Sequence, residues 1–289
     1  MPTPAVCLLG SIRTLSLECT GRATLERIVR PVDGTLFAFV NVPQQWEQAQ
    51  IVQTRALIAT LARSTGVRLA VNEVVNNVPN SAYKGAAQYH GFQRCWTVAS
   101  QMALYETIIR VRTDVYYGFR LPPPGHEFRL PPQIHLNIKH ANIIYAGWIG
   151  APSCGATTLS SAKRSRAYAI DDRFAIVHGR LAQRAYFSEF SENLAEFADR
   201  AAVRQLKVHV PTPECLLGMA IADVNDEVSN RPDLQIKLRD VRDLTSGYGR
   251  CDKANSQIIR SNCSAEIEAA HWVCPFSAAP AVLVLGDDR

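Results

Sequence analysis

Short apolar runs alternate with longer amphipathic segments along most of the chain, and this alternation limits the possible folds. Residues 5–9 and 35–40 are almost wholly apolar, which is typical of strands that are buried on both faces. Residues 45–64 have apolar side chains at helical spacing, and Gly66 follows as a stop signal. Interleaved strands and helices form a mostly parallel sheet with helices on its faces. The sequence therefore predicts an α/β sandwich with a mostly parallel central sheet.

Further elements follow the same alternation. Helices are expected at 25–29, 93–107, 191–206 and from 212, and strands at 67–75, 108–115, 141–148, 173–177 and 234–238. Residues 121–132 hold five prolines and are expected to be an extended loop, and residues 152–166 a loop rich in small residues. The tail from Thr245 shows no assignable pattern. We expect one domain over residues 1–243 and an irregular extension over 244–289 that packs on it.

Charge and hydropathy exclude several classes of protein. The net charge of +5 suits an anionic ligand, but it is too small and too scattered for duplex DNA, and the basic run 163–166 is short. No apolar run approaches the roughly 20 residues of a membrane span. The apolar run 5–9 is too short for the core of a signal peptide. We therefore expect a soluble, cytoplasmic protein that binds no nucleic acid.

Eight cysteines are spread along the chain without a CxxC pair, so a structural zinc site is not expected and most should be buried thiols. Cys251, Cys263 and Cys274 lie near His271, at spacings that match no common zinc pattern. Packing, an occasional disulfide or a metal remain open for this tail.

Three charges alternate with apolar residues in the expected strand 108–115. Period-two alternation places Arg110, Arg112 and Asp114 on one face, toward the carboxyl end of the strand. Buried charges require a partner or a ligand, and ligands of open α/β sheets bind at this edge. An internal ion pair is one interpretation. In the other, Asp114 holds a divalent metal or a sugar hydroxyl, and Arg110 or Arg112 orients it or meets a diphosphate.

The loop after the first strand is the second candidate. Gly10 and Ser11 lead to Arg13, a combination that lets backbone approach a ligand and offers a cation to phosphate. The alternative is a plain turn between a strand and a helix. The loop matches neither the P-loop nor the GxGxxG pattern.

Three acids later in the chain are candidates for acid–base chemistry. Asp171 and Asp172 precede an apolar run, where they could recognise an acceptor or take a proton from a hydroxyl, or form an Asx-turn or helix cap. Glu214 lies in the first turn of an expected helix, where an acid is favourable by itself. The seven histidines show no HxxxH or HxH spacing and no GxSxG is present, so a histidine metal triad and a serine hydrolase are not supported.

The order of these segments resembles a known type. An apolar strand ends in Gly-Ser-Ile-Arg-Thr (10–14), and a Trp- and Glu-bearing helix leads to Arg-x-Arg-x-Asp (110–114). Asp-Asp-Arg-Phe-Ala (171–175) and Pro-Glu-Cys-Leu-Leu (213–217) follow. Over residues 4–243 this is similar to poorly characterised glycosyltransferase-like proteins with a GT-A-type, Rossmann-like fold, found in algae, large viruses and bacteria.

The resemblance implies a three-layer α/β/α sandwich with a nucleotide-sugar donor across the carboxyl ends of the parallel strands. Gly10, Ser11 and Arg13 match the loop near the nucleotide. Asp114 matches the Asp-x-Asp position, but Arg112 replaces the first acid. Asp114 could hold Mg²⁺ or Mn²⁺ together with diphosphate oxygens and waters, or Arg110 or Arg112 could neutralise the diphosphate without metal.

The resemblance also implies roles for the three later acids. Asp171 and Asp172 match an acidic position that faces the acceptor or the donor sugar, and Glu214 matches an acid at a late helix start. If the reaction inverts at the sugar, Asp171, Asp172 or Glu214 could be the base.

The sequence thus predicts a glycosyltransferase that moves a sugar from a nucleotide diphosphate-sugar to a glycan or another hydroxyl acceptor. One alternative is a catalytically silent nucleotide-sugar-binding or scaffolding protein of the same fold. A nucleotidyltransferase is a further alternative, but the chain has no glycine-rich phosphate signature with a partner lysine.

Overall fold

A computed structural model describes most of the core of the chain. It covers residues 3–11, 17–76, 86–103, 105–113, 115–117, 120–121, 141–147, 149–150, 168–191, 213–241 and 248–250. Its strands are β1 (Ala5–Ser11), β2 (Thr35–Asn41), β3 (Arg68–Val75), β4 (Thr107–Arg112), β5 (Val115–Tyr117), β6 (Ile143–Ala146), β7 (Phe174–His178), β8 (Lys237–Asp240) and β9 (Tyr248–Arg250). Its helical segments are α1 (Leu17–Thr24), η1 (Leu25–Val29), η2 (Arg30–Val32), α2 (Gln48–Thr65), α3 (Ala86–Met102), α4 (Arg180–Gln183), η4 (Arg184–Glu189) and α6 (Pro213–Glu227).

The central sheet is mixed but mostly parallel. Seven strands follow the order β3-β2-β1-β4-β7-β6-β8, and β5 pairs separately with β9. Neighbours are parallel from β3 to β4 and again between β6 and β8, whereas β7 is antiparallel to both β4 and β6. The predicted α/β class with a mostly parallel sheet is therefore confirmed. The reversed strand β7 is the exception on which the candidate site depends.

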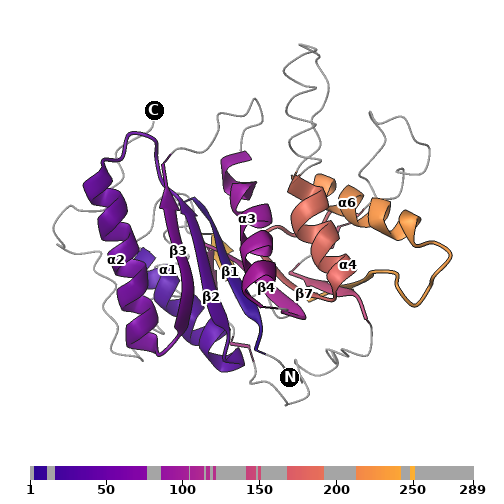
Figure 1. The fold of residues 1–289 in the computed structure, drawn as a ribbon, viewed down its shortest axis with the longest axis horizontal. Coiled ribbons are helices and arrows are strands. Elements are labelled where there is room, and N and C mark those ends of the chain that lie inside the picture. The colour runs from indigo at the N-terminus through magenta and orange to yellow at the C-terminus, as the bar shows by residue number, and fades with distance from the viewer. Residues whose placement is uncertain are drawn as a thin grey trace, which may run out of the picture.

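Helices cover both faces of the sheet (Figure 1). One core cluster joins the sheet to α3, η4 and α6, through residues such as Leu9, Phe92 and Leu217. The other joins the opposite face to η1 and α2, through residues such as Leu36 and Ile58. Alternate residues of each strand enter opposite clusters, as the pleat of a strand requires. The result is three layers: helices, sheet and helices.

Local sequence signals account for the ends of α2. Glu47 and Gln50 form a reciprocal capping box at its start. Gly66 closes it in the left-handed conformation, with φ of 71°, which glycine adopts without steric cost. The helix lies within the predicted range of 45–64 to within a few residues, so this prediction is confirmed.

Several predicted boundaries were wrong. The run 108–115 is not one strand: β4 ends at Arg112, and β5 begins at Val115 in a different sheet. The break follows from tertiary bonds, because the Thr113 N–H donates to the Leu9 carbonyl and the Thr20 hydroxyl donates to the Thr113 carbonyl. The helix expected over 93–107 spans Ala86–Met102 and does not lead directly into β4.

The later part of the chain shows further differences. β8 starts at Lys237, three residues after the predicted start at 234. Residues 248–250, which the sequence left unassigned, form β9 and pair with β5. The expected helix over 191–206 and the loops over 121–132 and 152–166 lie almost wholly outside the described residues, as does the tail with Cys251, Cys263 and Cys274.

A disulfide between Cys7 and Cys95 connects β1 to α3. Both residues are fully buried in the core cluster between the sheet and α3. Cys215 on α6 is also disulfide-bonded. The prediction that most cysteines are buried thiols is therefore wrong for these three. Sequence alone could not identify the first pair, because 88 positions separate its members. Among the described residues, no helix is both long and apolar enough to cross a membrane.

The disulfide yields a stability prediction. We expect Cys7→Ala and Cys95→Ala each to lower the free energy of unfolding by about 2–5 kcal/mol, because the cross-link restricts the unfolded chain. Urea unfolding in buffer without added oxidant or reductant measures the difference in free energy of unfolding between each variant and the parent protein. Because either substitution removes the same bond, the double variant should lose little more than each single one. Additive losses would contradict a bond between the two sulfurs.

Candidate functional site

The candidate site lies at the carboxyl edge of the sheet, between β1 and β4. The chain leaves β1 toward β2 on one side, while β4 pairs with β1 on the other, so the strand order reverses here. Ligands of open α/β sheets bind in the crevice beside such a switch point. Gly10 and Ser11 end β1 at this edge, and Arg112 ends β4. Since β7 runs in the opposite direction, its start brings Asp171 and Asp172 to the same edge.

A buried ion pair connects the end of β4 to the residues before β7. The Arg112 guanidinium donates from Nη1 to Asp172 Oδ2 at 3.1 Å, and both side chains are 5% exposed. Such a pair is costly to break, because removing one partner leaves the other charge buried and uncompensated. The internal ion pair that the sequence allowed at Arg112 is thus present, with Asp172 as the acid.

Tyr117 holds the same two segments through its hydroxyl. The oxygen accepts a bond of 2.9 Å from the Arg112 backbone N–H and donates one of 2.8 Å to the Arg173 carbonyl. Tyr117 is fully buried, so these bonds form away from water. The last residue of β4 and the entry to β7 are therefore fixed relative to each other.

Asp171 has a local structural role. Its Oδ1 accepts bonds from the Arg173 backbone N–H at 3.1 Å and from the Arg173 Nε at 2.8 Å. A carboxylate bound to the N–H two residues later forms an Asx-turn. The turn that the sequence offered as one interpretation of this segment is present, and the same carboxylate also forms an ion pair.

The start of α6 lies beside this turn. The Ile170 N–H donates to the Glu214 carbonyl at 3.0 Å. At Gly218, a Cβ would collide with the Tyr168 carbonyl, so a side chain at this position is incompatible with the close approach of the two segments. The backbone thus brings Glu214 near Asp171.

Gly10 is required where β1 ends. Its φ is +127°, and a Cβ there would lie 3.2 Å from Thr113 Oγ1. Residues other than glycine are strained at such a φ. The glycine is therefore explained by backbone geometry and by the close approach of Thr113, a simpler cause than contact with a ligand.

Arg110 lies two residues before Arg112 on the same face of β4, and it differs from Arg112 in having no carboxylate partner among the described residues. It is 1% exposed, and its Nε and Nη1 have no hydrogen-bond partner in the described part of the protein. Its guanidinium carbon lies 4.8 Å from the centre of the Phe92 ring of α3. This cation–π contact offsets part of the cost of burial, but it uses none of the N–H donors.

Tyr186 of η4 completes this buried group. Its ring stacks on Phe92, with centroids 5.7 Å apart and planes 19° apart. The hydroxyl is buried and has no hydrogen-bond partner among the described residues. Burial raises the pKa of Tyr186, the positive charge of Arg110 opposes this rise, and Asp172 and Asp171 add to it. The phenol therefore stays protonated and keeps its O–H donor.

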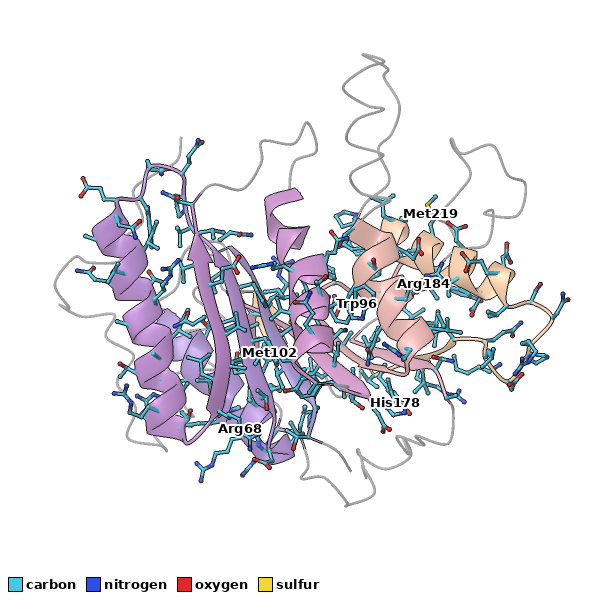
Figure 2. All side chains as sticks on the ribbon, viewed as in Figure 1. Arg68, Trp96, Met102, His178, Arg184 and Met219 are labelled. Atoms are coloured by element: carbon cyan, nitrogen blue, oxygen red, sulfur yellow. A yellow bond between two sulfur atoms is a disulfide. The ribbon has the colours of Figure 1, made fainter. Side chains whose placement is uncertain are left out.

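Neighbouring contacts hold η4 against both α3 and α6. Phe187 and Phe190 surround Phe92, with ring centroids 5.8 and 5.1 Å from it. On the outer side, Arg184 bonds Glu189 and Glu227, which joins η4 to α6 (Figure 2). The position of Tyr186 against Phe92 is thus set by packing on two helices.

The structure brings together six of the nine predicted site residues at or just below one edge of the sheet. These are Gly10, Ser11, Arg110, Arg112, Asp171 and Asp172. The backbone of Glu214 lies close by. Arg13 and Asp114 lie outside the described residues.

Tyr117, Tyr186 and Phe92 were not identified from the sequence. Tyr117 follows the charged run 110–114 closely, so its position in the sequence could have identified it as a candidate site residue. Tyr186 and Phe92 are aromatic residues at helical spacing, which sequence patterns assign to ordinary core. Their role depends on contact with or proximity to Arg110. Tyr186 lies 76 positions after Arg110 and Phe92 lies 18 positions before it, and a local sequence pattern does not show that residues so far apart are close in space.

The described acids do not by themselves make a metal site. No group of three His, Cys, Asp or Glu that could hold a cation occurs in the described residues. Asp172 is paired with Arg112 and Asp171 with Arg173, so their oxygens already meet cations. A divalent cation would depend on Asp114, together with oxygens of the substrate.

No model of a known protein family matches the chain, and no curated protein sequence matches it. Arguments about its function therefore depend on the residues and their geometry.

The buried ion pair leads to a second stability prediction. We expect Arg112→Met and Asp172→Asn each to destabilise the fold by about 3–5 kcal/mol, since each leaves a buried charge unpaired. The double variant should lose less free energy of unfolding than the sum of the losses of the two single variants. Urea unfolding of the four proteins measures this coupling.

The Arg231–Asp233 pair is the matched control, because both of its side chains are 63% exposed. Replacing either partner there should hardly change the urea midpoint, since exposed pairs contribute little. Equal effects at the two pairs would contradict the structural importance of Arg112–Asp172.

Proposed function

We propose that the protein is a GT-A-like glycosyltransferase, which moves a sugar from a nucleotide diphosphate-sugar to a hydroxyl acceptor. The observation that carries the proposal is the cluster of arginines and aspartates at the switch point of the sheet, where Arg112 and Asp172 meet. Buried charges are costly to keep unless they serve packing or a ligand. The proposal also agrees with the order of segments that resembles this type of enzyme.

Each residue then has a task that its chemistry allows. The loop of Gly10, Ser11 and Arg13 would hold the nucleotide, and Arg112 would face the diphosphate beside Asp114. In the reaction, the bond between the anomeric carbon and the diphosphate oxygen breaks, and the diphosphate leaves with the electron pair. The acceptor oxygen forms the new bond and gives its proton to a base. Positioning and neutralisation of the leaving group supply most of the catalysis.

Glu214 is the best placed of the three acids to act as that base. Asp172 and Asp171 are buried, and their carboxylates already accept bonds from Arg112 and Arg173, which leaves them less accessible to an acceptor hydroxyl. Glu214 is partly exposed, and its backbone lies next to Ile170. Asp171 and Asp172 would then position the donor-facing arginines and the entry to β7.

A catalytically silent binding protein is the second candidate. One observation favours it: both described aspartates at the edge are already paired with arginines, so neither is available to a metal. Such a protein would bind nucleotide sugars without cleaving them.

We also propose that the protein acts in an oxidising compartment, rather than in the cytoplasm that the sequence predicts. The Cys7–Cys95 disulfide supports this proposal, because disulfides persist mainly in secreted proteins and in oxidising compartments.

The donor site is tested by ligand binding. We expect a UDP- or GDP-linked sugar at millimolar concentration to raise the melting temperature, because a ligand that binds only the folded state stabilises it. A thermal-shift screen of nucleotide sugars, with and without Mn²⁺, measures this effect and its metal dependence. If no nucleotide diphosphate or nucleotide sugar shifts the melting temperature, the donor site is refuted. Binding without hydrolysis or transfer would favour the silent binding protein.

The role of Asp114 is tested by substitution. We expect Asp114→Asn to reduce transfer or donor hydrolysis at least about 100-fold, with little change in melting temperature, since it removes the carboxylate that would hold a divalent cation or a sugar hydroxyl of the donor. Asp226→Asn on the exposed side of α6 is the matched control and should keep full turnover. Near-normal turnover of the Asp114 variant would remove this residue from the mechanism.

A further inference from the structure

Arg110 is a buried positive charge for which the described protein supplies no counter-ion. Arg112 is paired with Asp172, and Arg173 is paired with Asp171. Arg110 is as deeply buried as any of them, yet among the described residues its guanidinium meets the face of the Phe92 ring and no carboxylate. Among the described residues, one positive charge of the cluster is therefore left without a counter-ion, and a buried charge without one costs stability.

Tyr186 supplies a second unused donor near the same position. Its hydroxyl is buried and has no hydrogen-bond partner among the described residues, and both Arg110 and the Tyr186 ring contact Phe92 from α3. Two buried polar side chains that lack partners in the described part of the chain, both against one aromatic ring, are unusual in a native structure. Such groups require a reason other than stability.

The chemistry of the two donors selects their ligand. A guanidinium and a phenolic O–H both donate, so their common partner must be an acceptor. The single uncompensated charge fits a group with one negative charge, and guanidinium binds carboxylate especially well. A diphosphate carries more charge and, under the proposed function, occupies the outer edge beside Arg112 and the Gly10 loop.

We infer that Arg110 and Tyr186 form a recessed subsite for the carboxylate of an acidic sugar. This inference rests on the proposed function, and it narrows the substrate class to sugars of the uronic acid type. The carboxylate could belong to the donor sugar or to the acceptor. In both cases Arg110 provides the charge, Tyr186 provides the second hydrogen bond, and Phe92 holds the guanidinium in place.

The first test compares matched neutral and acidic ligands. UDP-glucuronate is set against UDP-glucose, and GDP-mannuronate against GDP-mannose, for the donor arm. Methyl glucuronoside is set against methyl glucoside for the acceptor arm. We expect the acidic member of at least one pair to bind about 10- to 100-fold more tightly by calorimetry, the range for hydrogen bonds to charged groups. In Arg110→Met this ratio should fall to about one, and in Tyr186→Phe it should fall severalfold.

The outcomes separate the two proposals. If nucleotide sugars bind without preference for the acidic member, and the methyl glucuronoside shows none either, the carboxylate subsite is refuted and the donor site stands. If no nucleotide sugar binds but the methyl glucuronoside binds through Arg110, the subsite stands and the proposed donor site is refuted. If no compound binds, both are refuted.

The second test needs no ligand and uses Arg112 as the matched control on the same strand and face. We expect Arg110→Met to raise the melting temperature of the ligand-free protein by about 2 °C or more, because it removes an unpaired buried charge. Arg112→Met should lower it, because that variant leaves Asp172 unpaired. A loss of stability in Arg110→Met as large as in Arg112→Met would show that Arg110 serves the fold, and would overturn the inference.

Discussion

The ion pair between Arg112 and Asp172 holds together the part of the sheet where its direction changes. On one side of it, β1, β2, β3 and β4 are parallel, and on the other side β7 runs the opposite way. Backbone ladder bonds fix β4 and β7 only up to the pairs Arg110–Ala175 and Val111–Phe174. Beyond them, the ion pair and the Tyr117 hydroxyl continue the connection. The geometry of the edge therefore depends on side chains, which a substitution can remove.

The reversal of β7 explains how acids far along the chain reach the first strands. In a wholly parallel sheet, residues that precede a strand lie at the amino edge, away from the ligand crevice. Because β7 is antiparallel, the residues that precede it lie at the carboxyl edge of β1 and β4 instead. Asp172 thus meets Arg112 across 60 positions of sequence. His178 at the other end of β7 bonds Thr107 at the start of β4, which marks the opposite edge.

Local patterns predicted the elements of this fold but not its connections. The apolar runs of β1 and β2, and the caps of α2, are encoded within a few residues, so their positions followed from the sequence. The break at Thr113 is caused by bonds to Leu9 and Thr20, which a strand pattern does not contain. The partner of Arg112, the Cys7–Cys95 bond and the Phe92–Tyr186 stack all depend on contacts between distant segments. The prediction that Arg110 and Arg112 share one strand face was correct. Alternation alone could not show that Arg112 is paired with a carboxylate whereas Arg110 lies against an aromatic ring.

Two arginines on one strand face thus illustrate two uses of a buried charge. Arg112 has a carboxylate partner, and this pair gives the edge its geometry. Arg110 has an aromatic platform but no counter-ion among the described residues, so its burial opposes stability. Replacement by an apolar side chain of similar length would be favourable for the fold alone, since Phe92 and its aromatic neighbours already form a packed environment. A residue that costs stability at the switch point of an α/β sheet is best explained by a ligand that supplies the missing negative charge, which is why the carboxylate subsite follows from the energetics as well as from the geometry.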